Sequence, residues 1–242
     1  MFKRLVAILL ILASIPMIPA AYIYAKEVGK MVETRIYEEA NYNLVASRFA
    51  EVAATAGCGY ERPALPEFKR ADLVETGAGG FYMPDKRLVQ YDAEKVHYIQ
   101  HEIVHHLYGE QEYSRPCEER VFARILTRFF PEEDLATMSD ARAQAYLVEI
   151  FNYTYRRFIM AASMADGSNK IAGVKGGCLV PRPGIVLEMN PGTARFGTVR
   201  DFAFDSALFL FRQFEISDRC LNEMVAYSFV GLIHTKDHVN GK

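Results

Sequence analysis

The chain has 242 residues and a formal net charge of −2, and half of its residues are hydrophobic. A chain of this size can bury one sizeable core, which favours a single domain with or without an extension. The near-zero charge and the lack of any long basic run argue against nucleic acid as a main partner.

The first 25 residues differ in composition from the rest. Lys3 and Arg4 precede an apolar run over residues 5–25. This pattern is typical of a secretory signal peptide or an N-terminal membrane anchor. Neither Ala20 nor Ala25 has a small residue two positions before it, so the sequence leaves cleavage undecided. We expect export to the periplasm or the cell exterior, or anchoring in the membrane, with one domain over residues 26–242.

The segment between residues 26 and 92 divides into a helix and a region of short strands. Apolar residues recur about every 3.6 positions over residues 26–57, which predicts one long helix. Residues 80–83 and 87–91 alternate as strands do, with a turn after Pro84. These strands predict a small antiparallel sheet. Its edge could pair with an extended peptide, although a plain structural hairpin fits the sequence equally well.

The sequence His101-Glu102-Ile103-Val104-His105 follows this sheet, in a helix expected to start at Asp92 and to end at Gly109. Positions i and i+4 of a helix share a face, so both imidazoles can reach one ion. Two imidazole ligands suit Zn²⁺ and leave room for a third ligand and a water. Glu102 is placed to act as general base on that water. The alternative is a chance match on an amphipathic helix.

A carboxylate in the next helix, expected from Arg115 or Pro116, supplies a candidate third ligand. Glu118 lies on the face of this helix that is expected to pack against the motif helix. A carboxylate on a buried face needs a partner, and a metal ion is one. Glu119 is the rival ligand. A solvated carboxylate in a first helical turn is the structural alternative for either residue.

Beyond residue 131 the sequence predicts architecture and no chemistry. It indicates helices over about 139–164, 198–215 and 218–234, a loop over 166–184 and a short strand over 185–189. The cysteines form no C-x-x-C pair, so a structural zinc knuckle is not expected. Two disulfides with any of three pairings, or buried free thiols, remain open for Cys58, Cys117, Cys178 and Cys220.

The motif and the helix that follows it resemble the gluzincin branch of zinc metallopeptidases, in particular its short members. The resemblance rests on H-E-x-x-H and on Glu118 four residues before Phe122, and it covers about residues 80–130. It implies a zincin-like fold in which His101, His105 and Glu118 hold zinc and Glu102 is the general base. The metzincin extension of the motif is absent.

The sequence therefore predicts an α+β protein, a mostly helical zincin-like domain with a small antiparallel sheet beside the motif helix. The predicted function is zinc-dependent hydrolysis of a peptide bond in a peptide or protein substrate. A non-catalytic zinc-binding envelope or scaffold protein, and a zinc amidase acting on cell-wall peptides, are the alternative functions.

Overall fold

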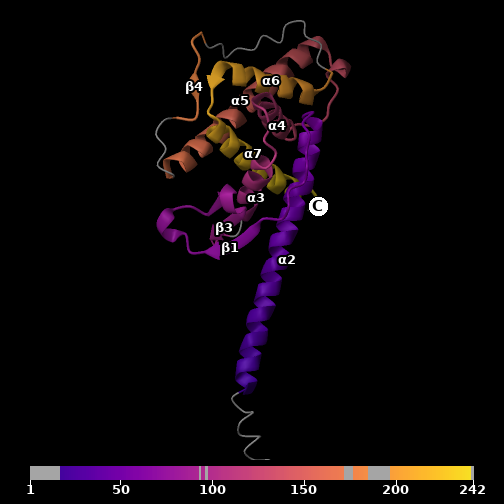
Figure 1. Cartoon of the computed structure of the whole chain (residues 1–242). Helices are drawn as coiled ribbons and strands as arrows, with labels where there is room; N and C mark the ends of the chain where they lie inside the picture. Colours follow the sequence, from indigo (N-terminus) through magenta and orange to yellow (C-terminus); the bar gives the residue numbers. More distant parts are fainter. Residues whose placement is uncertain (1–16, 93, 96–97, 172–176, 185–196, 241–242) are drawn as a thin grey trace, which may run out of the picture. The chain divides into compact units, whose positions relative to one another are not determined.

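The computed structural model describes residues 17–92, 94–95, 98–171, 177–184 and 197–240 (Figure 1). The chain divides into two compact units, residues 1–41 and residues 42–242. Most of the predicted signal or anchor segment, residues 1–16, lies outside the described residues. Within the described part of the chain, no helix is both long and apolar enough to cross a membrane.

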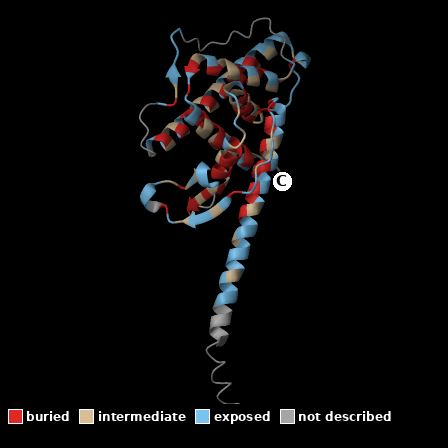
Figure 2. Ribbon diagram, in the orientation of Figure 1, coloured by how far each residue is buried: buried red, intermediate tan, exposed pale blue. Residues whose placement is uncertain are grey.

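Helix α2 (Met17–Thr55) extends the helix expected over residues 26–57 toward the N-terminus. In the first unit its described side chains are mostly exposed, as Figure 2 shows. Ion pairs one turn apart, Lys30–Glu27 at 3.1 Å and Arg35–Glu39 at 3.0 Å, support this stretch modestly. In the second unit, residues 42–55 of the same helix bury an apolar stripe that belongs to the core.

Five further helices build most of the second unit: α3 (Tyr98–Gly109), α4 (Arg115–Thr127), α5 (Asp140–Ile171), α6 (Val199–Gln213) and α7 (Asp218–Asn240). Helix α7 packs against α3, α4 and α5, and α6 packs against α4 and α5. The rings of Phe122, Phe158 and Phe211 meet edge to face in this core, with centroids 5.1–5.7 Å apart. Short 3₁₀ turns lie at Val74–Thr76, Pro84–Lys86 and Leu135–Thr137.

In the described part of the chain, each helix expected from the sequence is present, but the ends of several helices differ from the prediction. Helix α5 continues to Ile171, into the stretch predicted as loop. Its last turns stay helical because Asn169 is buried there and donates hydrogen bonds to the sulfurs of Cys178 and Cys220. Asp92 ends a strand and does not cap α3; its carboxylate accepts a hydrogen bond from the Glu94 N–H. The strand predicted over 185–189 lies outside the described residues.

A three-stranded sheet lies beside α3 and contains β1 (Glu67–Ala71), β2 (Gly80–Met83) and β3 (Leu88–Asp92) in the order β1-β3-β2. The expected hairpin, β2 with β3, is antiparallel, but β1 pairs with β3 in parallel. The prediction of an antiparallel sheet is therefore wrong: the sheet is mixed, because the chain crosses over after β1. Strand β2 is an edge strand, and a second sheet pairs β4 (Val180–Pro181) with β5 (Phe214–Glu215).

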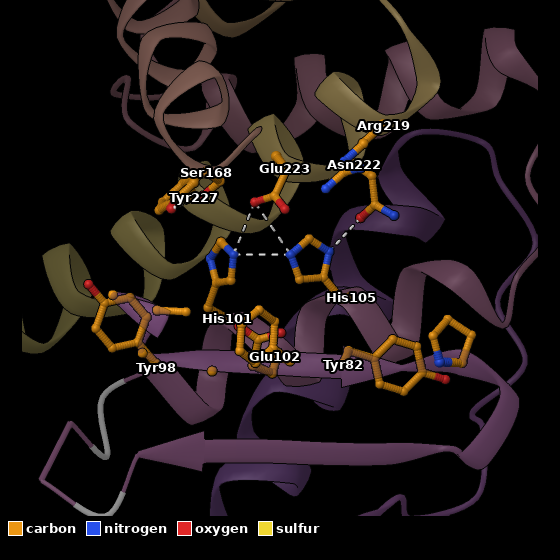
Figure 3. Close-up of a pocket in the computed structure, with 16 residues that line it drawn as sticks. Tyr82, Tyr98, His101, Glu102, His105, Ser168, Arg219, Asn222, Glu223 and Tyr227 are labelled. Carbon is orange, nitrogen blue, oxygen red and sulfur yellow. Dashed lines mark hydrogen bonds and ion pairs between the residues drawn. The ribbon is translucent and has the colours of Figure 1, made fainter. Parts of the chain in front are cut away.

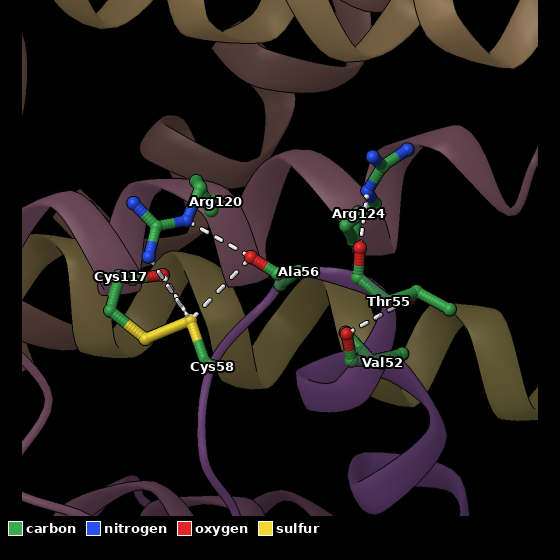
Figure 4. The surroundings of a disulfide bond; sticks show 7 residues. All are labelled: Val52, Thr55, Ala56, Cys58, Cys117, Arg120 and Arg124. Atoms are coloured by element: carbon green, nitrogen blue, oxygen red, sulfur yellow. Dashed lines mark hydrogen bonds between the residues drawn. A yellow bond between two sulfur atoms is a disulfide. The ribbon is translucent and has the colours of Figure 1, made fainter.

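Both disulfides that the cysteine count allowed are formed, Cys58–Cys117 and Cys178–Cys220. The first joins the residues just after α2 to the start of α4 (Figure 4). Beside it, Arg120 and Arg124 each donate a 2.9 Å hydrogen bond to a carbonyl at the end of α2. These side chains satisfy carbonyls that a helix C-terminus leaves without intrahelical partners. The fold as a whole is α+β and mostly helical.

Candidate metal centre

Helix α3 is buried on both of its long sides. One stripe of the helix, formed by Ile99, Ile103 and Leu107, is completely buried in the apolar core. His101 and His105 lie roughly opposite this stripe, at about 100° per residue, and face α7. His101 is 6% exposed, which is low for a polar side chain and makes a partner for its ring nitrogens obligatory.

Glu223 of α7 meets the two histidines in the cleft that Figure 3 shows. The Nε2 atoms of His101 and His105 lie 3.0 Å apart. Oε2 of Glu223 lies 3.3 Å from the first and 3.6 Å from the second. A tetrahedral ion with ligands at about 2.0–2.1 Å separates its ligand atoms by about 3.3 Å. The three atoms are therefore spaced as ligands of one such ion.

The chemistry of the group also fits a cation. Oε2 of Glu223 is buried and has no hydrogen-bond partner among the described residues. Two Nε2 atoms that face each other repel unless a proton or a metal ion lies between them. A divalent ion would satisfy all three atoms together, and buried carboxylates without a hydrogen bond call for such a partner.

Asn222 orients His105. Its Oδ1 accepts a 2.7 Å hydrogen bond from Nδ1 of His105, which leaves Nε2 to face Glu223. On the other side of the group, the ring of Tyr227 packs 4.4 Å from the ring of His101, and its hydroxyl is hydrogen-bonded to Ser168. Helix α7 therefore supplies a potential ligand and contacts both histidines.

The electrostatics of the metal-free group follow from burial and from Glu223. Burial lowers the pKa of His101. Burial acts in the same direction on His105, but the nearby carboxylates of Glu223 and Glu102 outweigh it and raise that pKa. Burial would raise the pKa of Glu223, whereas the two histidines lower it far below its ordinary range. Without a metal, a proton on His105 balances the Glu223 carboxylate.

Glu102 is 5% exposed and lines the same cleft. Burial raises its pKa to about 7, against the favourable charge of His105 and a hydrogen bond from the backbone of Tyr82. Strand β2 can approach Glu102 closely because residue 80 is glycine. A Cβ there would lie 2.7 Å from Cγ of Glu102, closer than real Cβ contacts allow.

The structure does not bring the predicted third ligands to the histidines. Glu118 lies beside Tyr108 near the end of α3, where burial raises its pKa. Glu119 forms an ion pair with Arg115 at 3.0 Å. Neither glutamate lies beside the two histidines, because α7, and not α4, packs along α3. The carboxylate that lies with His101 and His105 is that of Glu223.

A sequence signal for Glu223 did exist. Between Cys220 and Ile233 it is the one charged residue in a run that reads as a buried helix. A lone carboxylate on such a helix needs a partner, by the same argument that was applied to Glu118. The sequence around Glu223 does not identify that partner, because Glu223 lies 118 positions after His105 in the chain.

The cleft around the group has a volume of about 310 Å³. One wall is formed by residues 77–84, which include edge strand β2, and the other walls come from α3, α5 and α7 (Figure 3). Its size and its mixed polar and apolar lining are compatible with a short stretch of extended peptide. Comparisons with protein-family models, with curated proteins and with solved structures give no match to this chain.

Proposed function

We propose that the protein is a zinc metallopeptidase with a zincin-like fold, and that His101, His105 and Glu223 hold the metal. The observation that carries the proposal is the group of three buried ligand atoms with Glu102 in the same cleft. Glu223 replaces Glu118 and Glu119 as the third ligand in this proposal. Three protein ligands leave a fourth position for water, which is typical of catalytic zinc sites and not of structural ones.

The residues of the chain divide the work of hydrolysis. A bound zinc ion would supply Lewis acidity toward the water and the peptide carbonyl. Glu102 accepts the proton of the attacking water and passes it to the leaving amine, because it lines the same cleft as the three ligand atoms. Asn222 holds His105 in the tautomer that binds metal. The free edge of β2 offers backbone groups to an extended substrate.

Export or membrane anchoring remains part of the proposal. Disulfides persist in oxidising compartments, and both cysteine pairs of this chain are bonded. The apolar run after Lys3 and Arg4 would direct the chain there.

Metal analysis combined with digestion of a peptide mixture tests the proposal. The purified full chain should bind about one zinc per molecule and cleave peptides, as read by mass spectrometry. His101→Ala should lose the metal and the activity together. A chain that binds zinc but cleaves nothing would instead support the non-catalytic zinc protein. A chain that binds no zinc would exclude both functions.

A further inference from the structure

Arg219 lies in the first turn of α7 and lines the cleft, where it is the one arginine or lysine among the described lining residues. It precedes Asn222 and Glu223 by three and four positions, so all three side chains share one face of the helix. Figure 3 shows Arg219 on the side of the cleft near Asn222 and His105, away from Tyr98 and Tyr227.

The guanidinium group of Arg219 is not used by the fold. The side chain is exposed to the cleft and has no hydrogen bond or ion pair with another described residue. The neighbouring residue, Asp218, forms an ion pair with Arg115 at 2.9 Å. The amide nitrogen of Asn222 likewise has no described partner, because Asn222 contacts His105 through Oδ1. The cleft thus holds two sets of N–H donors that have no acceptor among the residues described.

We infer that Arg219 binds a carboxylate of the peptide substrate; this inference rests on the proposed function and specifies its substrate class. A guanidinium matches the planar, two-oxygen geometry of a carboxylate better than that of a single carbonyl. The cleft's own carboxylates, Glu102 and Glu223, already serve as base and ligand, so the free cation is available to the substrate.

The distance along α7 limits where that carboxylate lies. Four residues of helix between Arg219 and Glu223 rise about 6 Å. An extended peptide advances about 3.4 Å per residue, so the carboxylate belongs one or two residues from the bond that is cleaved.

The carboxylate has two possible sources, which depend on how the peptide pairs with β2. Gly80 approaches Glu102, and the Tyr82 ring contacts His106, so β2 runs alongside α3 in the same direction. Arg219, near His105, therefore lies toward the Tyr82 end. A peptide antiparallel to β2 would present an acidic side chain there, N-terminal to the scissile bond. A parallel peptide would present a residue C-terminal to that bond, including a terminal carboxylate.

Four fluorescent heptapeptides of one sequence test the inference, with a central Glu or Gln and with a C-terminal carboxylate or carboxamide. The zinc-loaded full chain carrying Glu102→Gln binds them without consuming them, and fluorescence anisotropy measures Kd. We expect the preferred carboxylate to improve affinity roughly tenfold, the lower range for a hydrogen bond to a charged group. A difference between the Glu and Gln peptides identifies an acidic side chain as the source of the carboxylate. A difference between the carboxylate and carboxamide peptides identifies the C-terminus.

The added substitution Arg219→Gln should remove this preference and leave zinc content and the affinity for the fully amidated peptide unchanged. Arg142→Gln is the matched control, because Arg142 is exposed on α5 and does not line the cleft. Equal affinity for all four peptides, no binding of any of them, or a preference that survives Arg219→Gln would overturn the inference. Failure of the proposed function is seen separately, as absence of cleavage by the unmodified chain.

Discussion

Glu102 and Glu223 carry the same side chain, and we propose different roles for them, as general base and as metal ligand. Glu102→Gln keeps the shape of the side chain but cannot accept a proton. The variant should retain zinc and lower peptide hydrolysis by roughly 10²–10⁴-fold, the usual contribution of general acid–base catalysis. Metal analysis and a hydrolysis assay on the same preparation check both parts. Full activity in this variant would disprove the mechanism.

The third ligand can be tested by two matched glutamate substitutions. Glu223→Ala removes the atom 3.3 Å from Nε2 of His101, so it should abolish tight zinc binding and activity together. Glu118→Ala removes a carboxylate beside Tyr108 and should leave zinc content unchanged. Zinc titration of both proteins decides between them. Loss of zinc in Glu118→Ala but not in Glu223→Ala would identify Glu118 of α4 as the third ligand.

At the scale of elements, the approach of β2 to α3 depends on Gly80. In Gly80→Ala the new Cβ would meet Cγ of Glu102 at 2.7 Å, and the Glu102 side chain must move. We expect zinc to be retained and kcat/KM to fall roughly 10²-fold, since a displacement of about 1 Å at a reacting group costs this much. Gly59→Ala, which has open space around the added carbon, is the control and should be neutral. Equal activities of the two variants would show that the close contact has no role in catalysis.

At the scale of the whole molecule, zinc binding should stabilise the fold, because the proposed ligands come from two helices, α3 and α7, that pack against each other. Zinc at a free concentration of about 100 times its Kd should add about 2.7 kcal/mol to the free energy of unfolding. Thermal unfolding of the full chain with and without zinc measures this. Glu223→Ala should show no such gain, and a gain of equal size would mean that zinc binds elsewhere.

Zinc affinity should also fall as the pH falls. The raised pKa of His105 means that its imidazole is protonated in the metal-free protein, and zinc must displace that proton. Below this pKa, each pH unit should weaken binding up to tenfold, whereas above it the dependence should disappear. Calorimetric titration at pH 6, 7 and 8 in buffers of different ionisation enthalpy measures the released proton. An affinity that stays constant from pH 6 to 8 would contradict a protonated His105.

The sequence by itself determined the parts of the molecule that depend on neighbours in the chain. The helix over Tyr98–Gly109 places His101 and His105 one turn apart, which needs no tertiary information. The β2–β3 hairpin, helices α6 and α7 and the mostly helical α+β class follow from local periodicity and turns in the same way.

Tertiary structure alone decided which distant segments meet. Glu118 and Glu223 are both carboxylates on apolar helices, and the choice between them depends on α7 packing along α3. The parallel pairing of β1 with β3 and the pairing of Cys58 with Cys117 are decided in the same way. Local propensity cannot rank such contacts, because their free energy comes from burial shared among segments that lie far apart in the chain.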